Sequence, residues 1–181
     1  MGVNTGVADA DGMTPLLLAA RHQSVKVLQP LLNKDSVIAQ DKINCNVLHH
    51  ALRNRQGEAL VPLILEQNLD LNQCNDDKQT PLHYAVRFNK PNALQLLLDK
   101  EVDLGRKDYQ ELTAADLAIK LSNLIILHKV LHAKNFSMEM ISRAATTKDI
   151  SDMLQECSGR SAEPKKGGFG DRLCKRKKKE S

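Results

Sequence analysis

Aromatic residues and long apolar runs are scarce in this chain of 181 residues. Phe, Trp and Tyr together make up 3% of it and Trp is absent, whereas hydrophobic residues as a whole reach 41%. A core must therefore be built from aliphatic side chains, which favours helices. No stretch approaches the roughly 18 apolar residues of a membrane span, and the first ten residues lack the pattern of a secretion signal. We expect one soluble, intracellular domain.

Clusters of metal-binding or catalytic residues are also lacking. The four cysteines form no Cys-x-x-Cys pair, so we expect reduced thiols and no disulfides: Cys45, Cys74, Cys157 and Cys174. His128 and His132 share a helical face, but two ligands do not make a zinc site. The glycines of residues 167–170 precede a run of lysines and not a helix, which excludes a phosphate loop. The sequence therefore predicts no cofactor, no metal and no catalytic residue.

The positive charge is concentrated at one end of the chain. Residues 158–181 contain nine Lys and Arg against three Asp and Glu, net +6. The remaining residues, 1–157, have 17 against 19, net −2, and the whole chain is +4. The basic character therefore belongs to a tail and not to the body.

A repeat of about 33 residues runs through that body. Four related segments begin at Thr14, Asn46, Thr80 and Thr113, at steps of 32, 34 and 33 residues. Further columns agree in the same register: Ala19, Ala51, Ala85 and Ala118; Leu28, Leu60, Leu94 and Leu127; Leu31, Leu63, Leu97 and Val130. Such a period indicates a stacked array of small units, each of which buries its apolar face against its neighbours.

Each unit has the pattern of two short antiparallel helices and a loop. The Thr or Asn that opens a segment can cap the first helix, and Pro15 and Pro81 follow at a position where a missing N–H costs nothing. The Ala column allows neighbouring first helices to approach closely. Large aliphatic residues spaced i, i+3, i+4, as at Leu94, Leu97 and Leu98, predict the buried face of the second helix.

These segments resemble the ankyrin repeat, and residues 80–85, with the sequence Thr-Pro-Leu-His-Tyr-Ala, are close to that family's pattern. The resemblance implies an all-α solenoid over residues 7–157 and a disordered basic tail over 158–181. The predicted repeats cover residues 9–40, 41–74, 75–107 and 108–134, followed by a degenerate capping repeat over 135–157. It also implies a protein that binds other proteins and is not an enzyme.

Three departures from the family pattern predict local differences. Only Gly12 matches the glycine of the hairpin turn, while Asn44, Lys78 and Glu111 replace it, so we expect those turns to be strained or differently shaped. Leu17 and Asp116 replace the family histidine retained at His49 and His83, so one loop-bracing hydrogen bond should be lost in repeats one and four. Pro30 and Pro62 share a column of the second helix, where each should kink or tighten it.

The register places one basic residue per repeat in a single column. We call these residues the basic row: Arg21, Arg53, Arg87 and Lys120. In the family this column lies on the concave face, where partners bind, so an acidic partner would suit it. The alternative is that these residues only solvate the helix ends.

Further partner contacts are expected from apolar side chains on the concave face and hairpin tips. Phe88 and Tyr109 are the aromatic candidates, with Ile43, Leu112 and Leu121 beside them. The position before each opening Thr or Asn is assigned to the same surface: Met13, Cys45, Gln79 and Leu112.

Asn72 follows Leu69, Asp70 and Leu71 in the loop after repeat two. In the family such an asparagine can be a substrate for asparaginyl hydroxylation. The alternative is an asparagine that only braces the loop.

The tail contains five consecutive basic residues: Lys175, Arg176, Lys177, Lys178 and Lys179. This run resembles a nuclear localisation signal that would bind an import receptor. A solubilising end remains an alternative, as does an electrostatic tether to nucleic acid or to membrane, in which Cys174 could be acylated.

These observations favour a protein-binding adaptor or regulator in the cytoplasm, the nucleus or both. The second hypothesis is a nuclear factor that binds nucleic acid or chromatin through the tail. A third, a fragment of an ankyrin-containing enzyme, would need a longer chain. Repeat one has no polar cap before it, so we expect either a longer array or self-association through that end.

Overall fold

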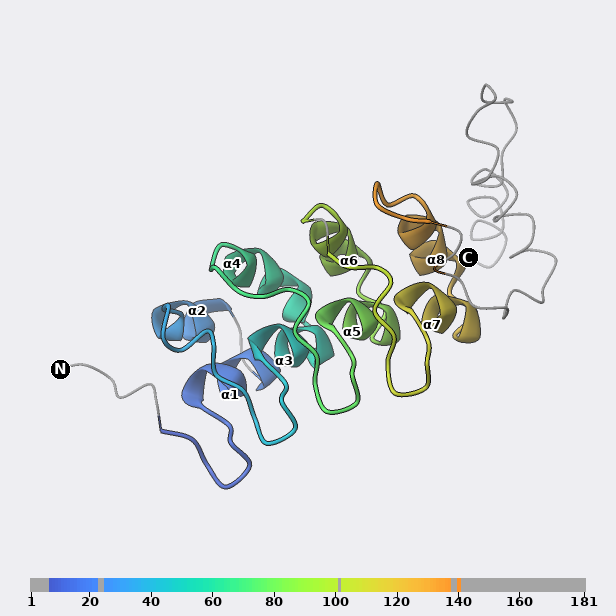
Figure 1. Ribbon diagram of the computed structural model, residues 1–181. Helices are drawn as coiled ribbons and strands as arrows, with labels where there is room; N and C mark the ends of the chain where they lie inside the picture. Colours follow the sequence, from blue (N-terminus) through green and yellow to red (C-terminus); the bar gives the residue numbers. More distant parts are fainter. Residues whose placement is uncertain (1–6, 23–24, 101, 138–139, 141–181) are drawn as a thin grey trace, which may run out of the picture.

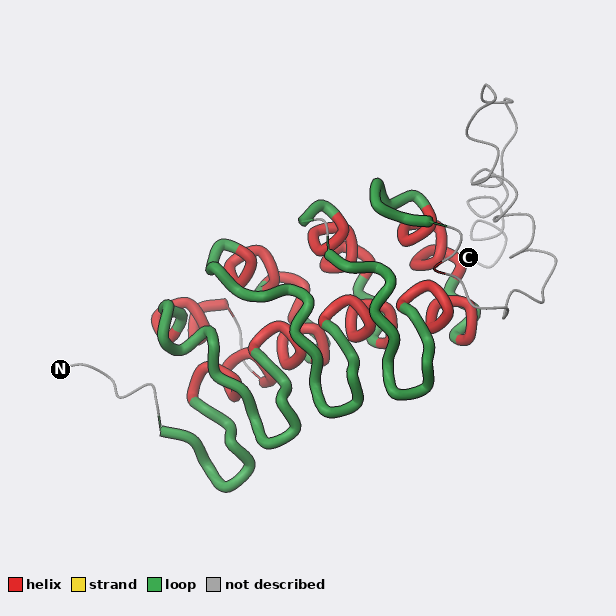
Figure 2. Tube along the Cα trace, viewed as in Figure 1, coloured by secondary structure: helices red, strands yellow, loops and turns green. Residues whose placement is uncertain are grey.

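The computed structural model describes residues 7–22, 25–100, 102–137 and 140. In these residues helices alternate with loops and no strand occurs (Figure 2). The first helices of the four repeats are α1 (Pro15–His22), α3 (Val47–Arg53), α5 (Pro81–Arg87) and α7 (Ala114–Lys120). The second helices are α2 (Val25–Leu28), α4 (Val61–Leu65), α6 (Pro91–Leu98) and α8 (Leu124–Leu131). The predicted all-α solenoid is confirmed.

The helices form two parallel rows, with α1, α3, α5 and α7 in one and α2, α4, α6 and α8 in the other (Figure 1). A loop projects from the first-helix row ahead of each first helix, and these hairpins stack in the order of the chain. Each repeat thus contacts mainly its neighbours, as expected for a solenoid.

The first helices begin where the capping pattern predicts. Asn46, Thr80 and Thr113 are N-caps whose side chains accept hydrogen bonds from the first turns of α3, α5 and α7. All three form complete capping boxes with the residue at the third helical position. In repeat one the Thr14 hydroxyl accepts a bond of 3.4 Å from the Leu17 amide.

The core follows the columns of the repeat. The four alanines of the first helices, Ala19, Ala51, Ala85 and Ala118, are at most 2% exposed. Because these side chains are small and fully enclosed, the first helices pack closely, α1 on α3, α3 on α5 and α5 on α7. The first leucine column of the second-helix segments is equally buried, at Leu28, Leu60, Leu94 and Leu127.

The two prolines lie at different places in the second helices: Pro30 is in a tighter 3-10 turn, in line with the prediction, whereas Pro62 is in the first turn of α4, where no kink follows from it. Helix α2 has four residues and passes into a 3-10 turn, η1 (Gln29–Leu31), that contains Pro30. In repeat two a 3-10 turn, η2 (Gly57–Ala59), precedes the five-residue α4, which has Pro62 in its first turn. Helices α6 and α8, without a proline at this column, are continuous over eight residues each.

The four hairpin turns share one shape, so of the two expected alternatives, strain or a different shape, the structure agrees with strain. Asn44, Lys78 and Glu111 have φ of 60°, 56° and 59°, in the left-handed region, where Gly12 has φ of 78°. In each turn the amide of this residue donates to the carbonyl three positions earlier, for example Lys78 N to Asn75 O at 2.9 Å. These repeated hydrogen bonds hold the backbone of Lys78 and Glu111 in a conformation that favours glycine.

The two family histidines brace the following hairpins. His49 Nε2 lies 3.0 Å from the Gln79 carbonyl, and His83 Nε2 lies 3.1 Å from the Leu112 carbonyl, so each Nε2–H donates. Leu17 has no polar group for such a bond. Asp116 instead accepts from the Thr113 amide and hydroxyl at 3.0 and 2.9 Å, which completes the cap of α7.

The chain beyond α8 returns towards the N-terminal end of α7. Thr113 Oγ1, whose single proton is shared with Asp116, lies 2.9 Å from the Met140 carbonyl oxygen, and Asn135 Nδ2 donates to the Val102 carbonyl at 2.7 Å. Phe136 and Met140 pack against the core. The predicted capping repeat, 135–157, and the tail, 158–181, otherwise lie outside the described residues, and the repeat boundaries stay predictions.

Candidate functional site

The basic row lies at the C-terminal ends of the first helices. Arg53, Arg87 and Lys120 are the last residues of α3, α5 and α7, and Arg21 is the last but one of α1. Arg21 is half-buried and the other three are exposed. Because helix C-termini carry partial negative charge, these cations also stabilise their own helices. This interaction with the helix end leaves the charged groups able to bind an external anion.

Two members of the basic row reach back to the hairpins of their own repeats. Arg87 Nη1 donates to Gln79 Oε1 at 3.3 Å, and Lys120 Nζ donates to Gln110 Oε1 at 2.7 Å. These bonds cross from the helix end to the hairpin, so the two parts form one continuous surface. We call it the hairpin face.

No carboxylate of the described residues forms an ion pair with the basic row. The ion pairs there join His50 to Asp41, Arg106 to Asp103 and Lys107 to Glu111. The acceptors of Arg87 and Lys120 are neutral amides, which fix the position of each cation without cancelling its charge. The hairpin face therefore has positive charge available to an external anion.

The hairpin tips are held in register by main-chain bonds between repeats. Lys42 N donates to Asp11 O, Asp76 N to Ile43 O and Tyr109 N to Asp77 O, at 3.0, 3.0 and 2.9 Å. Asn44 Nδ2 adds a bond of 2.6 Å to Asp76 Oδ1. These bonds make the row of tips a connected edge.

Only some of the predicted apolar contacts are exposed. Tyr109, Ile43 and Leu121 expose 58%, 49% and 47% of their surface. Phe88 is half-buried, contrary to expectation, and its ring lies against Tyr84 with the centroids 5.5 Å apart. Leu112 is half-buried as well.

In repeats one to three the position before the opening Thr or Asn faces the core, and its assignment to the surface is wrong there. Met13, Cys45 and Gln79 are at most 4% exposed. Each is enclosed between its hairpin and the first helices, where stacking of the adjacent repeat removes it from solvent. The candidate surface thus consists of the basic row, the tips and three exposed apolar side chains.

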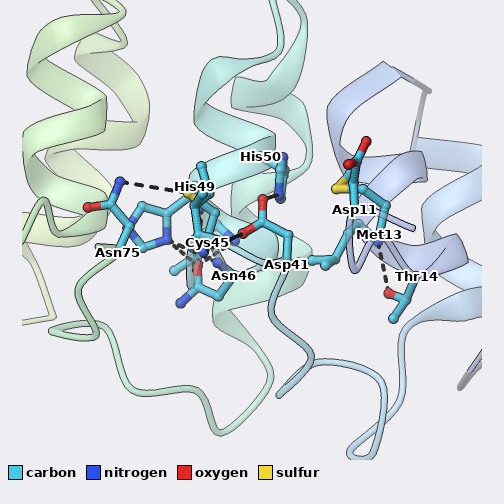
Figure 3. A network of polar contacts seen from close by, with 12 residues as sticks. Asp11, Met13, Thr14, Asp41, Cys45, Asn46, His49, His50 and Asn75 are labelled. Atoms are coloured by element: carbon cyan, nitrogen blue, oxygen red, sulfur yellow. Dashed lines mark hydrogen bonds and ion pairs between the residues drawn. The ribbon is translucent and has the colours of Figure 1, made fainter. Parts of the chain in front are cut away.

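Sequence reasoning missed a buried polar layer behind this surface, drawn in Figure 3. His50 is 3% exposed, and its Nε2 lies 3.0 Å from Asp41 Oδ2 at the base of the same hairpin. Its Nδ1 has no partner among the described residues. Burial lowers the pKa of His50, although the Asp41 carboxylate opposes that shift, so the neutral ring is favoured. The spacing of Asp41 and His50, nine residues, was the available signal.

The next repeat contains a related contact. The Tyr84 hydroxyl accepts from Asn75 Nδ2 at 3.1 Å and lies 3.4 Å from Cys45 Sγ. Burial raises the pKa of the Tyr84 hydroxyl and of the Cys45 thiol. Cys45 is therefore a protonated, enclosed thiol and not a reactive thiolate. This layer supports the hairpins and does not reach the surface.

Asn72 is half-buried and braces the loop of the next repeat. Its side-chain Oδ1 accepts from the main-chain N–H of Asp103 at 2.8 Å, and its main-chain N–H donates to Asp70 Oδ1 at 2.9 Å. This geometry agrees with the bracing role. Hydroxylation of Asn72 stays a prediction.

The other predicted sites give little further chemistry. The histidine rings of His128 and His132 stack at 3.9 Å on α8, and the described residues hold no group of three or more metal-ligating side chains. Within the same residues, no helix is long and apolar enough to cross a membrane. The proposed import signal, Lys175, Arg176, Lys177, Lys178 and Lys179, lies outside them.

Comparison with known proteins agrees with the geometry. A family model described as ankyrin repeats (3 copies) matches residues 1–72 and 48–140. A putative ankyrin repeat protein of fowlpox virus is 32% identical over 124 residues, which cover 65% of this chain and 36% of the viral protein. Inversin of the dog is 30% identical over 66% of this chain, and the tyrosine-protein kinase Shark of Drosophila melanogaster 34% over 52%. The matches span 12% of inversin and 10% of the kinase.

Proposed function

Because the chain belongs to the ankyrin-repeat family, whose repeats mediate protein–protein interaction, we propose that it is a non-catalytic adaptor or regulator that binds a partner through the hairpin face. The observation that carries this proposal is the basic row. It places one cation at or near the end of each first helix, and the hairpins and helix ends also carry exposed Tyr109, Ile43 and Leu121. A charged surface with apolar anchors is typical of an interface.

The unpaired charge of the basic row favours a partner with an acidic face. A carboxylate that replaced the amide acceptors of Arg87 and Lys120 would form charge-assisted bonds, about twice as strong as neutral ones. Arginine is also suited to bidentate bonds with carboxylates. Arg53, Arg87 and Lys120 are the main candidates, and half-buried Arg21 extends the row to repeat one.

The test compares two charge-reversed variants of the full chain as affinity baits. Arg53→Glu with Arg87→Glu changes the basic row, and Lys26→Glu with Lys34→Glu reverses the same charge at exposed positions outside it. We expect a partner retained by the control to be weakened by roughly 1–3 kcal/mol in the row variant. Equal binding by both variants, with unchanged circular dichroism, would refute the proposal.

Phe88→Ala is a poorer test of the interface because the ring also packs against Tyr84 and the core. Loss of binding in that variant could follow from loss of packing. Tyr109→Ala is cleaner, since the side chain is mostly exposed.

We also propose nuclear import for the tail, on the strength of the five consecutive basic residues at 175–179. The test fuses residues 158–181 to a reporter too large to diffuse through nuclear pores. Nuclear accumulation that is abolished by Lys175→Ala, Arg176→Ala, Lys177→Ala and Lys178→Ala supports import. A cytosolic reporter in both versions overturns it, and membrane enrichment lost on Cys174→Ser indicates a lipid tether instead.

A further inference from the structure

The spacing of the basic row limits the conformation of a partner. The first helices that end in these cations stack side by side, with fully buried alanines at their contacts. Helices in such close contact lie about 8–10 Å apart. The row therefore presents one positive charge about every 10 Å along the array.

Regular conformations of a partner chain match this spacing differently. A β-strand rises about 3.3 Å per residue, but the residue three positions on, which matches the spacing, points to the opposite face. An α-helix rises about 1.5 Å per residue, so its acidic side chains would have to be seven residues apart to match the distance between neighbouring cations. A polyproline II helix rises about 3.1 Å per residue with three residues per turn, so every third side chain returns to one face after roughly 9 Å.

We propose, on the basis of the proposed function, that the hairpin face binds an acidic segment in the polyproline II conformation, with Asp or Glu at every third position. One carboxylate pairs with each of Arg53, Arg87 and Lys120. The Arg87 and Lys120 side chains exchange their amide acceptors, Gln79 and Gln110, for these carboxylates.

Two features favour polyproline II over a helical partner. Its backbone has no internal hydrogen bonds, so its carbonyls can accept the guanidinium donors of Arg53 and Arg87 that a carboxylate leaves unused. An α-helix has already paired these carbonyls. Tyr109 is 58% exposed at the tip of repeat four, and aromatic side chains of this kind pack well on proline rings.

The experiment uses three fluorescent peptides of equal length and charge, measured by anisotropy at about 50 mM salt to limit screening. One has four Glu-Pro-Pro repeats between neutral flanking residues, one has the same composition with the glutamates in adjacent pairs, and one is helical with four glutamates, one at every seventh position. The protein is the full chain with residues 175–179 replaced by Ala, so that the tail does not bind the peptides.

We expect the Glu-Pro-Pro peptide to bind at least about tenfold more tightly than the other two. Arg53→Glu, Arg87→Glu and Lys120→Glu together should abolish that binding. The control combines Lys26→Glu, Lys34→Glu and Lys134→Glu, which reverse three exposed cations outside the hairpin face, and should stay within about twofold.

Three outcomes overturn the inference. Equal binding of the paired-glutamate peptide would refute the three-residue spacing but would still indicate an acidic partner. Tighter binding of the helical peptide would indicate that the partner segment is an α-helix. If no peptide binds, the inference fails, while the bait experiment with Arg53→Glu and Arg87→Glu still decides the proposed function separately.

Discussion

The second helices of repeats one and two differ from those of repeats three and four, although all four first helices are alike. In the repeats that carry Pro30 and Pro62, helices α2 and α4 have four and five residues, whereas α6 and α8 have eight. One consequence is visible in a single column, where Leu31 and Leu63 are half-buried but Leu97 and Val130 are at most 1% exposed. The same hydrophobic pattern thus buries less surface where the helix is interrupted.

This difference predicts a graded stability along the array, because the stability of a solenoid is approximately a sum over repeats and their contacts. The C-terminal half should be the more resistant to local opening. The hairpin face spans both halves, so its geometry depends on the weaker half as well.

The largest expected effect comes from the column that distinguishes the two halves. Leu97→Ala removes a fully buried side chain and should cost about 2–5 kcal/mol in the free energy of unfolding. Leu63→Ala, at the same column, should cost less than half as much because that side chain is half-buried. Urea unfolding followed by circular dichroism measures both, and equal costs would contradict the comparison.

A proline swap breaks the comparison directly. Leu96 occupies the column of Pro30 and Pro62 but lies inside continuous α6. Leu96→Pro should cost about 3 kcal/mol, because it removes a helical hydrogen bond and clashes with the preceding turn. The reverse change, Pro62→Leu, should alter the unfolding free energy by less than about 1 kcal/mol. Hydrogen exchange should show the loss of protection confined to residues 91–98; loss spread over all four repeats would contradict a local effect.

Acid should destabilise the N-terminal half more than the C-terminal half. Burial lowers the pKa of His49 to about 4 and lowers the pKa of His50, both in repeat two, whereas His83 alone is affected in repeat three. Because the unfolded chain binds more protons than the folded one, stability is complete above pH 6.5 and is lost as the pH falls from 6.5 towards 4. His49 by itself should account for about 3 kcal/mol at pH 4.

The measurement is the free energy of unfolding as a function of pH for the native chain and for His49→Leu, which installs the residue that repeat one has at Leu17. The variant should be less stable at pH 7, since it loses the bond to the Gln79 carbonyl, and should have a flatter pH dependence. An unchanged slope would show that His49 does not control the acid response.

The smallest expected effect concerns turn strain, which should be greater in the C-terminal half although that half is the more stable one. Lys78 and Glu111 hold left-handed turns in repeats three and four, where repeat one has Gly12 and repeat two has Asn44. Lys78→Gly should stabilise the chain by up to about 1 kcal/mol, because the relief of strain exceeds the entropy cost of glycine. Asn44→Gly should gain nothing, since it loses the bond to Asp76. Thermal unfolding measures both, and destabilisation by Lys78→Gly would show the turn to be unstrained.

Much of the fold could be predicted because its signals are local. Thr80 with His83 and Thr113 with Asp116 form caps from residues three positions apart, and the effect of Pro30 on its own helix needs no distant partner. The candidate site was less predictable. The sequence located the basic row but not the neutral amide acceptors of Arg87 and Lys120. Each bond joins a side chain at a helix end to a glutamine of the hairpin, so it depends on the conformations of both side chains.

The sequence by itself determined the repeat length, the starts of the first helices and the leucine column of the core, since each follows from spacing within one unit. Only the tertiary structure decided the positions that depend on a neighbouring unit. The sequence pattern assigns Met13, Cys45, Phe88 and Tyr109 to the surface, but only Tyr109 is exposed. His50, which has no role assigned by that pattern, is enclosed. The physical reason is that burial in a solenoid is set by contacts between residues of adjacent repeats, such as Cys45 with Tyr84, 39 positions apart, and His49 with Gln79, 30 positions apart, which no local pattern encodes.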